Sequence, residues 1–208
     1  MTRRSELLAI LTAAVRAGTP ISFVKRGDGE EFCMAGERGE NCDGHPYSAE
    51  LGAALKEAFA FLEKRPDVFV APWCDQERYQ VLLHIVGVDI GATVAFWKAV
   101  GESARPKVFV GPARLEGAAR MLGADHVVVP LQNAFSRYEA IRGELLARAK
   151  PRVIFVFCAG MPAKAWIAEV LQACRGASCI DAGSAFDPLF AGNTRTGQLD
   201  ERARELYA

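Results

Sequence analysis

The chain has no excess charge of either sign and few histidines. Its 208 residues include 25 lysines and arginines, 25 aspartates and glutamates, and 3 histidines. A balanced charge gives no general attraction for polyanions, whereas nucleic-acid-binding domains usually carry a basic excess or stripe. His45, His84 and His126 lack the spacing of metal ligands. The composition therefore argues against a dedicated nucleic-acid binder and against a histidine metal centre.

Long apolar runs and cysteine motifs are also missing. The segment 79–97 is rich in apolar residues, but His84 and Asp89 interrupt it, so we expect no membrane span. None of the 6 cysteines forms a C-x-x-C pair. Cys174 and Cys179 have a spacing that would allow pairing in an oxidising compartment, but we favour reduced thiols. We therefore expect a cytoplasmic protein.

Two common nucleotide-binding fingerprints are absent as well. There is no G-x-x-x-x-G-K-[ST] loop, and no G-x-G-x-x-G stands at the end of an expected strand. The chain has no internal repeat, low-complexity segment or linker, and its length suits one domain with a full core. We therefore expect a single domain over 1–208, with a polar tail over 192–208.

What the chain does contain is a regular alternation of short apolar runs and helical patterns. Several runs are almost continuously β-branched or aromatic, as in sheets covered by helices on both faces. The alternation predicts a Rossmann-like α/β fold with a mostly parallel, twisted sheet. The expected strands are Ile21–Val24, Val68–Ala71, Val108–Val110, His126–Val129, Val153–Phe157 and Ser178–Ile180. Helices are expected near 5–16, 48–64, 76–86, 92–103, 113–122, 134–149 and 163–175.

The motif Arg26-Gly27-Asp28-Gly29-Glu30 directly follows the first expected strand. Glycine permits a sharp turn, and residues i and i+2 of an extended segment share a face, so we expect Asp28 and Glu30 to aim together. Such carboxylates suit Mg²⁺ or Mn²⁺, which commonly combine one or two carboxylates with substrate phosphates. Arg26 would either neutralise phosphate or pair with a neighbouring carboxylate. The motif indicates chemistry on a phosphate-bearing substrate.

Polar residues also follow the later strands, at the edge where open α/β sheets bind ligands. Gly160 to Lys164 opens a helix, where free N–H groups and the lysine favour a phosphate, although a plain strand-to-helix turn fits equally well. Asp181 and Asp187 flank a Gly-Ser pair, and each is either a structural residue or a general base. The glycine- and acid-rich loop 35–47, which contains His45, is long enough to be functional.

Several of these motifs, in their order along the chain, resemble the GT-D fold glycosyltransferases, small bacterial enzymes with an Asp-x-Glu motif. The resemblance covers about residues 20–190. The motifs that carry it are Val24 to Glu30, Val110-Gly111-Pro112, Pro130 to Phe135, Ala159-Gly160 with Pro162 and Lys164, and Ile180 to Ser184 with Asp187. Lys25 departs from the pattern expected before Arg26, and so does the composition of the 35–47 loop.

The resemblance implies a hexosyltransferase-like enzyme that moves a sugar from a nucleotide-sugar, typically a UDP-sugar, to a hydroxyl of a glycan, glycoprotein or other acceptor. It implies that Asp28 and Glu30 hold Mn²⁺ or Mg²⁺ against the donor diphosphate, where a metal stabilises developing negative charge. It also implies Asp181 or Asp187 as the acceptor-side base, with Glu30 as an alternative. The implied donor-binding residues are Arg26, Gly27, Gly29, Gly111, Pro112, Asn133, Gly160, Lys164, Gly183 and Ser184.

The residues themselves leave other functions open. The same carboxylates would serve a metal-dependent nucleotide-sugar or phosphoester hydrolase that acts through water. A non-catalytic nucleotide-binding module would share the same sheet edge. A modified base in nucleic acid is a further acceptor, which the neutral net charge disfavours. The apolar 79–97 segment would serve either as core or as an oligomer interface.

Overall fold

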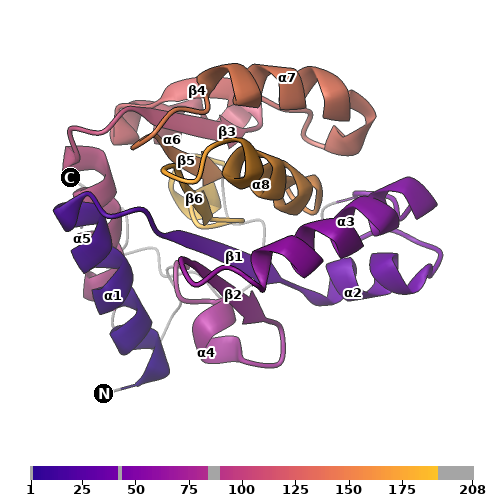
Figure 1. The fold of residues 1–208 in the computed structure, drawn as a ribbon, viewed down its shortest axis with the longest axis horizontal. Coiled ribbons are helices and arrows are strands. Elements are labelled where there is room, and N and C mark those ends of the chain that lie inside the picture. Colours follow the sequence, from indigo (N-terminus) through magenta and orange to yellow (C-terminus); the bar gives the residue numbers. More distant parts are fainter. Residues whose placement is uncertain (1, 42–43, 84–89, 192–208) are drawn as a thin grey trace.

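The strands of the chain form one parallel sheet. The structure is a computed structural model that describes residues 2–41, 44–83 and 90–191. The strand order is β2-β1-β6-β5-β3-β4, and each described pair is parallel (Figure 1). The bounds are β1 Ser22–Arg26, β2 Val68–Pro72, β3 Lys107–Gly111, β4 Asp125–Val128, β5 Ile154–Phe157 and β6 Ser178–Asp181.

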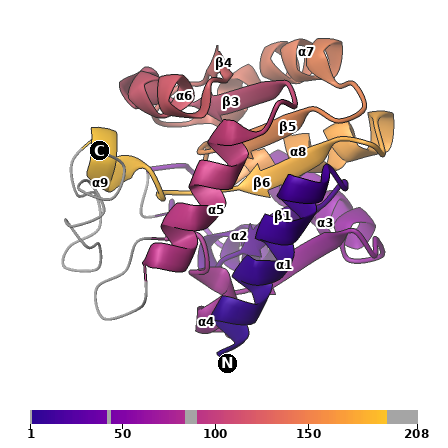
Figure 2. The same cartoon turned by 90° about the vertical axis from the view of Figure 1, so that its left-hand side faces the viewer.

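Helices cover both faces of the sheet. One face carries α2, α3, α7 and α8, and the other carries α1, α5 and α6 (Figures 1 and 2). The helix bounds are α1 Arg3–Ala17, α2 Asp28–Ala35, α3 Ala49–Leu62, α4 Gln76–Tyr79, α5 Gly91–Glu102, α6 Glu116–Leu122, α7 Tyr138–Arg148, α8 Pro162–Ala173 and α9 Asp187–Phe190. Two 3₁₀ turns, η1 Ala113–Leu115 and η2 Ala134–Arg137, precede α6 and α7. The predicted α/β architecture is confirmed.

The central strand β5 shows why its sequence is apolar without interruption. Side chains of a strand point alternately to opposite faces. Phe155 and Phe157 therefore pack with the helices of one face, whereas Ile154 and Val156 pack with those of the other. All four side chains are fully buried. A strand with a hydrophobic layer on each side needs apolar residues at every position.

The expected elements match the structure except at four places. The helix expected near 76–86 is only the short α4, and residues 84–89 lie outside the described chain. The helices expected near 113–122 and 134–149 each begin with a 3₁₀ turn. The largest difference is α2, because the sequence reading placed Asp28 to Glu30 in an extended turn.

The helix α2 begins at Asp28, immediately after β1, because its first turn satisfies its own N–H groups. The Glu30 carboxylate accepts a hydrogen bond from the Gly27 N–H at 3.0 Å, which is half of a capping box. Asp28, Glu30 and Glu31 put three carboxylates in the first turn, where the helix dipole favours negative charge. The same acidic residues that suggested a metal site are therefore also a helix-start signal.

The structure bears on two sequence features, the apolar segments and the pair Cys174 and Cys179. Within the described ranges, none of the helices combines the length and the apolar character needed to cross a membrane. Cys174 and Cys179 are both free thiols, as the reduced reading expects. The expected polar tail over 192–208 lies outside the described residues.

Gly52 allows α3 to approach the backbone of α2, the helix that carries Asp28. A Cβ atom at Gly52 would lie 2.6 Å from the Cys33 carbonyl oxygen. We predict that Gly52→Ala lowers the free energy of unfolding by about 1–3 kcal/mol, since the helices must separate to admit the methyl group. Urea denaturation measures this change.

Gly143→Ala on α7 is the matched control, because no neighbouring atom lies within 4 Å of its added Cβ. There the substitution removes only the helix-disfavouring glycine, so the free energy of unfolding should rise by roughly 0.5–1 kcal/mol. A similar gain for Gly52→Ala would contradict the tight α2–α3 contact.

Candidate functional site

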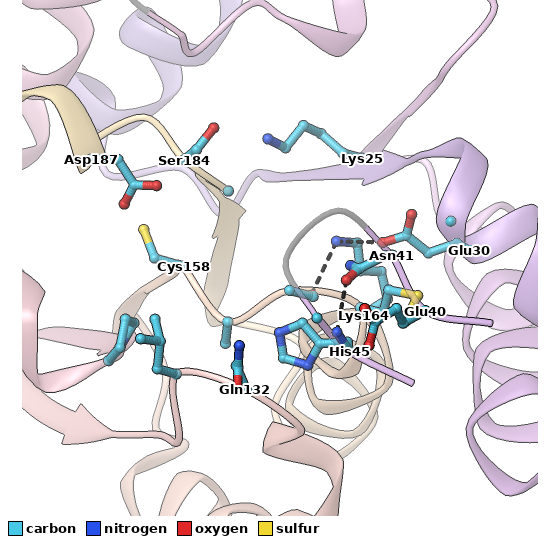
Figure 3. Close-up of a pocket in the computed structure, with 18 of the residues that line it drawn as sticks. Lys25, Glu30, Glu40, Asn41, His45, Gln132, Cys158, Lys164, Ser184 and Asp187 are labelled. Carbon is cyan, nitrogen blue, oxygen red and sulfur yellow. Dashed lines mark hydrogen bonds and ion pairs between the residues drawn. The ribbon is translucent and has the colours of Figure 1, made fainter. Parts of the chain in front are cut away.

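A crevice runs along the carboxyl ends of the strands. Its volume is about 920 Å³, which lies within the range of small-molecule binding sites. The crevice lies where open parallel sheets ordinarily bind ligands. Figure 3 shows that its polar side chains come from separate strand ends and loops. Those that carry charge are Lys25, Asp28, Glu30, Glu40, Arg114, Lys164 and Asp187.

A buried lysine joins three elements at this crevice. Lys164 on α8 places its Nζ atom 2.8 Å from Glu30 Oε1 on α2 and 3.1 Å from Asp181 Oδ2 on β6. Burial acts to lower the pKa of the Lys164 ammonium, but the Asp181 and Glu30 carboxylates outweigh it and raise that pKa above its ordinary value. Lys164 therefore stays charged at neutral pH and is engaged by protein carboxylates.

Asp28 and Glu30 both line the crevice, but they do not share a face as the extended-segment reading expected. Successive helix positions are about 100° apart, so the two side chains leave α2 in nearly opposite directions. Glu30 is engaged through both oxygens, by Lys164 and by the Gly27 N–H. Asp28 is exposed and accepts one hydrogen bond, at Oδ1 from the Gly29 N–H at 2.9 Å.

These contacts decide how well the pair suits a divalent cation. Among the described residues, no cluster of three or more His, Cys, Asp or Glu side chains is placed to hold a metal. Asp28 suits a cation that takes one carboxylate and completes its shell with water and phosphate oxygens. Glu30 suits that role only if its ion pair with Lys164 breaks.

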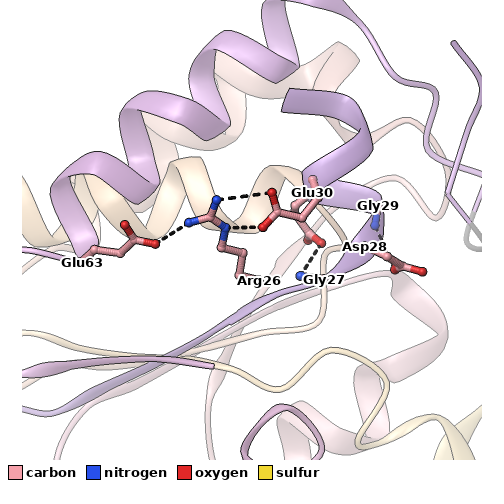
Figure 4. Close-up of polar contacts among 7 residues, drawn as sticks. Arg26, Gly27, Asp28, Gly29, Glu30 and Glu63 are labelled. Carbon is pink, nitrogen blue, oxygen red and sulfur yellow. Dashed lines mark hydrogen bonds and ion pairs between the residues drawn. The ribbon is translucent and has the colours of Figure 1, made fainter. Parts of the chain in front are cut away.

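Arg26 lies away from the crevice. Its guanidinium pairs with Glu63 (Figure 4) and with Glu31, the latter at 2.6 Å. It also lies over the Phe59 ring. Of the two alternatives left open by the sequence, the structure shows pairing with neighbouring carboxylates. Those carboxylates raise the pKa of Arg26 further, because the hydrogen bond that Arg26 donates to Glu31 outweighs the effect of burial.

Lys25, one residue earlier in β1, points into the crevice instead. The side chain is 7% exposed, and its Nζ lies 3.4 Å from the Ala182 carbonyl oxygen and 5.6 Å from the centre of the Tyr79 ring. Figure 3 shows its amine directed toward the loop that carries Ser184. The sequence reading noted Lys25 only as a departure from the family pattern. The signal in the sequence that could have identified Lys25 as a crevice residue is a lysine directly after the apolar run of a buried strand.

The two candidate bases differ in their access to the crevice. Asp181 is 1% exposed, does not line the cavity, and accepts hydrogen bonds from Lys164 and from the Lys25 backbone N–H. Asp187 lines the cavity, and its Oδ2 lies 3.6 Å from Arg114 Nη2. Asp181 is therefore placed as a structural anchor, whereas Asp187 is placed to meet a ligand.

The loop after β6 brings small polar groups to the same side of the crevice. The Ser184 Oγ atom is buried and has no hydrogen-bond partner within the described residues. Gly183 has a left-handed backbone with φ +56°, and a Cβ there would lie 2.1 Å from Lys25 Nζ. Only glycine leaves room for the lysine, so this loop and the end of β1 fit together.

The remaining expected donor-binding residues divide between the crevice and the core. Gly29, Pro112 and Gly160 line the cavity. Gly160 has φ +65°, and the His45 ring lies where its Cβ would be. Gly111 lies instead against the Phe109 ring, and Asn133 opens η2 with a left-handed φ of 47°. Neither of these two lines the cavity, and Gln132 does so in place of Asn133.

The loop 35–47 lines the crevice through Glu40, Asn41, Gly44, His45 and Tyr47, with 42–43 outside the described residues. The sequence analysis selected this loop but not three other lining residues, Tyr79, Arg114 and Cys158. Burial raises the pKa of the Cys158 thiol well above its ordinary value, so Cys158 is a poor nucleophile. Trp73 is 44% exposed and meets Tyr79 edge-on at 5.3 Å.

Two solved structures share the fold. One is a structure of domain of unknown function 1792, at 17% sequence identity and a TM-score of 0.63, covering 86% of this chain and 77% of that one. The other is described by the statement that this domain has a distinct glycosyltransferase fold; it has 18% identity, a TM-score of 0.63, and coverage of 85% and 76%. A scan of protein-family models and a search of curated proteins found no match. At this identity the similarity shows the fold.

We predict that Lys164→Met lowers the free energy of unfolding by about 3–5 kcal/mol, because it leaves the Glu30 and Asp181 carboxylates buried without their cation. The raised pKa of Lys164 means that its stabilisation is fully present below the ordinary lysine pKa of about 10.4 and is lost as pH rises through the higher folded value. The deficit should therefore stay nearly constant between about pH 7 and 9. Urea denaturation across this range measures it.

A double-mutant cycle with Glu30→Gln tests the coupling itself. The combined variant should be more stable than the sum of the single losses predicts, by about 0.5–3 kcal/mol. Strict additivity would show that the Lys164–Glu30 contact does not stabilise the protein.

Proposed function

We propose that this protein transfers a sugar from a nucleotide-sugar donor, such as a UDP-sugar, to an acceptor hydroxyl. The observation that carries the proposal is one crevice that combines a lysine, an exposed carboxylate and a buried carboxylate: Lys25, Asp28 and Asp187. The glycosyltransferase fold described for the structural neighbours supports it. Donor, acceptor and metal are parts of the proposal.

Lys25 is the residue best placed to bind the donor diphosphate. Its ammonium is buried in the crevice, where a charge interacts more strongly than in water. The Ser184 hydroxyl beside it has no hydrogen-bond partner among the described residues, and it would donate to a phosphate or sugar oxygen. Together these groups would neutralise and orient the leaving group.

Asp28 would hold Mn²⁺ or Mg²⁺ with the donor phosphates, as a single protein carboxylate. When bound, the cation would stabilise the negative charge on the departing nucleotide diphosphate. Glu30 would position Asp28 rather than bind the metal. Its carboxylate accepts a hydrogen bond from the Gly27 N–H at the start of α2 and pairs with Lys164. This arrangement modifies the paired-ligand role that the family resemblance implies.

Asp187 would serve as the acceptor-side base. Its carboxylate lies at the crevice, with Oδ2 3.6 Å from Arg114 Nη2. A carboxylate within hydrogen-bond reach of the acceptor would take its proton as the oxygen attacks the sugar carbon. Asp181 would position Lys164 and the end of β1.

The crevice does not favour nucleic acid as the acceptor. Its lining includes four carboxylates, Asp28, Glu30, Glu40 and Asp187, and three cationic side chains, Lys25, Arg114 and Lys164. A groove that follows a phosphate backbone requires a cationic excess. A glycan, glycoprotein or other neutral hydroxyl compound fits this lining better.

We predict that Asp28→Asn lowers metal-dependent sugar transfer by about 100-fold, since a group that stabilises leaving-group charge is lost. Lys25→Met should weaken donor binding, whether or not Mn²⁺ is present. A panel of nucleotide-sugars, tested with and without Mn²⁺ by thermal shift and by nucleotide release in the presence of hydroxyl acceptors, measures both effects.

Glu31→Gln is the matched control, because Glu31 lies on the same helix but pairs with Arg26 outside the crevice. It should change transfer by less than roughly threefold. Release of free sugar as the main product, unaffected by acceptors, would identify a hydrolase. If Asp28→Asn and Lys25→Met both kept full donor binding and activity, the site would be wrong.

A further inference from the structure

A second cavity lies at the opposite edge of the sheet, where the strands begin. Its volume is about 380 Å³, and the C-terminal ends of α1 and α5 form much of its wall. These two helices pack side by side on one face of the sheet (Figures 1 and 2). Three arginines line it: Arg16, Arg105 and Arg152.

Arg105 is the innermost of these residues. Its side chain is 4% exposed, its Nε donates to the Arg152 carbonyl oxygen at 2.6 Å, and its Nη2 donates to Ser178 Oγ at 2.8 Å. Its Nη1 is buried and has no hydrogen-bond partner within the described residues. A buried donor of a charged group is costly to leave unsatisfied. Arg105 therefore keeps one cationic donor beside the cavity that the described residues leave unsatisfied.

No acid neutralises these guanidinium groups within the described chain. None of Arg16, Arg105 and Arg152 forms a salt bridge with a described residue, although Glu102 lines the same cavity. Burial lowers the pKa of Arg105, and the nearby positive charge of Arg152 lowers it further. The cavity therefore concentrates like charges that an anion would relieve.

Arg152 lines this cavity from an unusual backbone conformation. Its φ of 71° is left-handed, a conformation that favours glycine or asparagine and is costly for arginine. The Arg152 Nη2 atom lies 4.0 Å from the position of a Cβ on Gly18, at the end of α1. An arginine in this strained position extends its charge across the cavity to α1.

The partial negative charges at the C-terminal ends of α1 and α5 are too small to neutralise the three arginines. The α5 terminus already has a cation, because Lys107 Nζ donates to the Gly101 and Ser103 carbonyl oxygens at 3.1 and 2.6 Å. The α1 terminus is closed by Gly18, whose N–H donates to the Val15 carbonyl oxygen. A helix end contributes only about half a negative charge. Three arginines therefore exceed the combined charge of the α1 end and Glu102.

We propose that this cavity is an anion site that binds a phosphate group between Arg16, Arg105 and Arg152. The guanidinium fork matches the arrangement of phosphate oxygens, whereas a spherical anion such as chloride offers no pair of acceptor atoms for it. The group would come from inorganic phosphate or from a nucleotide. The site is separate from the strand-end crevice and does not depend on the proposed transferase function.

Thermal unfolding in inorganic phosphate, compared with sodium chloride at equal ionic strength, tests the site. Phosphate should raise the melting temperature of the wild type, because a ligand that binds the folded state stabilises it. Arg152→Gly should lose at least half of this phosphate-specific shift, and Arg16→Gln combined with Arg152→Gly should lose nearly all of it. Glycine fits the left-handed backbone, so these variants should fold.

Arg148→Gln on α7 is the charge-matched control and should keep the full shift, because Arg148 does not line the cavity. Repeating the measurement with a nucleoside monophosphate distinguishes the two sources of phosphate. The quantity compared is the melting-temperature shift of the wild type minus that of the double variant. If this difference is larger with the nucleotide than with inorganic phosphate, the site takes a nucleotide. The proposal is overturned if the wild type shows no phosphate-specific shift, or if the double variant keeps the wild-type shift.

Discussion

The contact on which the crevice depends is the buried ion pair of Lys164 with Glu30 and Asp181. It connects α2, near the start of the chain, to the consecutive elements α8 and β6 at the carboxyl edge of the sheet. Because burying an unpaired charge is expensive, the loss of Lys164 would leave both carboxylates in an unfavourable state. Glu30 in turn holds the Gly27 N–H and thereby fixes the start of α2, from which Asp28 reaches the crevice. The position of the exposed Asp28 carboxylate therefore depends on the buried ion pairs of Lys164.

The sequence was sufficient to predict the fold and the edge of the sheet that forms the crevice. Apolar runs such as Val153–Phe157 indicate strands buried on both faces, and alternation with helical patterns indicates a parallel sheet. Once the sheet is parallel, the residues after each strand must gather at one edge. This reasoning placed Asp28, Gly160 and Ser184 at one edge of the sheet, and the structure brings all three to the cavity. These predictions depend on the periodicity of apolar residues, which can be observed in a single sequence.

The sequence was not sufficient to predict which side chains face the crevice. Arg26 and Lys25 are adjacent cations at the end of β1, and strand geometry sends them to opposite faces. Arg26 therefore pairs with carboxylates on its own side, and Lys25 enters the crevice. Asp28 and Glu30 separate for a related reason, because two residues apart means one face in a strand and nearly opposite faces in a helix. Such assignments depend on where β1 ends and α2 begins, and element boundaries are the weakest part of a sequence reading.

The charge of the crevice gives an independent reason for a cation in the proposed reaction. Lys164 is already balanced by Glu30 and Asp181, so it offers little net attraction to a donor phosphate. Of the other charged lining residues, Lys25 and Arg114 are cationic, while Asp28, Glu40 and Asp187 are anionic. A nucleotide diphosphate brings further negative charge into this lining, and its binding is opposed unless a positive charge enters with it. A divalent cation at Asp28 would reverse that balance next to Lys25, so the electrostatics of these residues support the proposed metal more directly than the Asp-x-Glu pattern does.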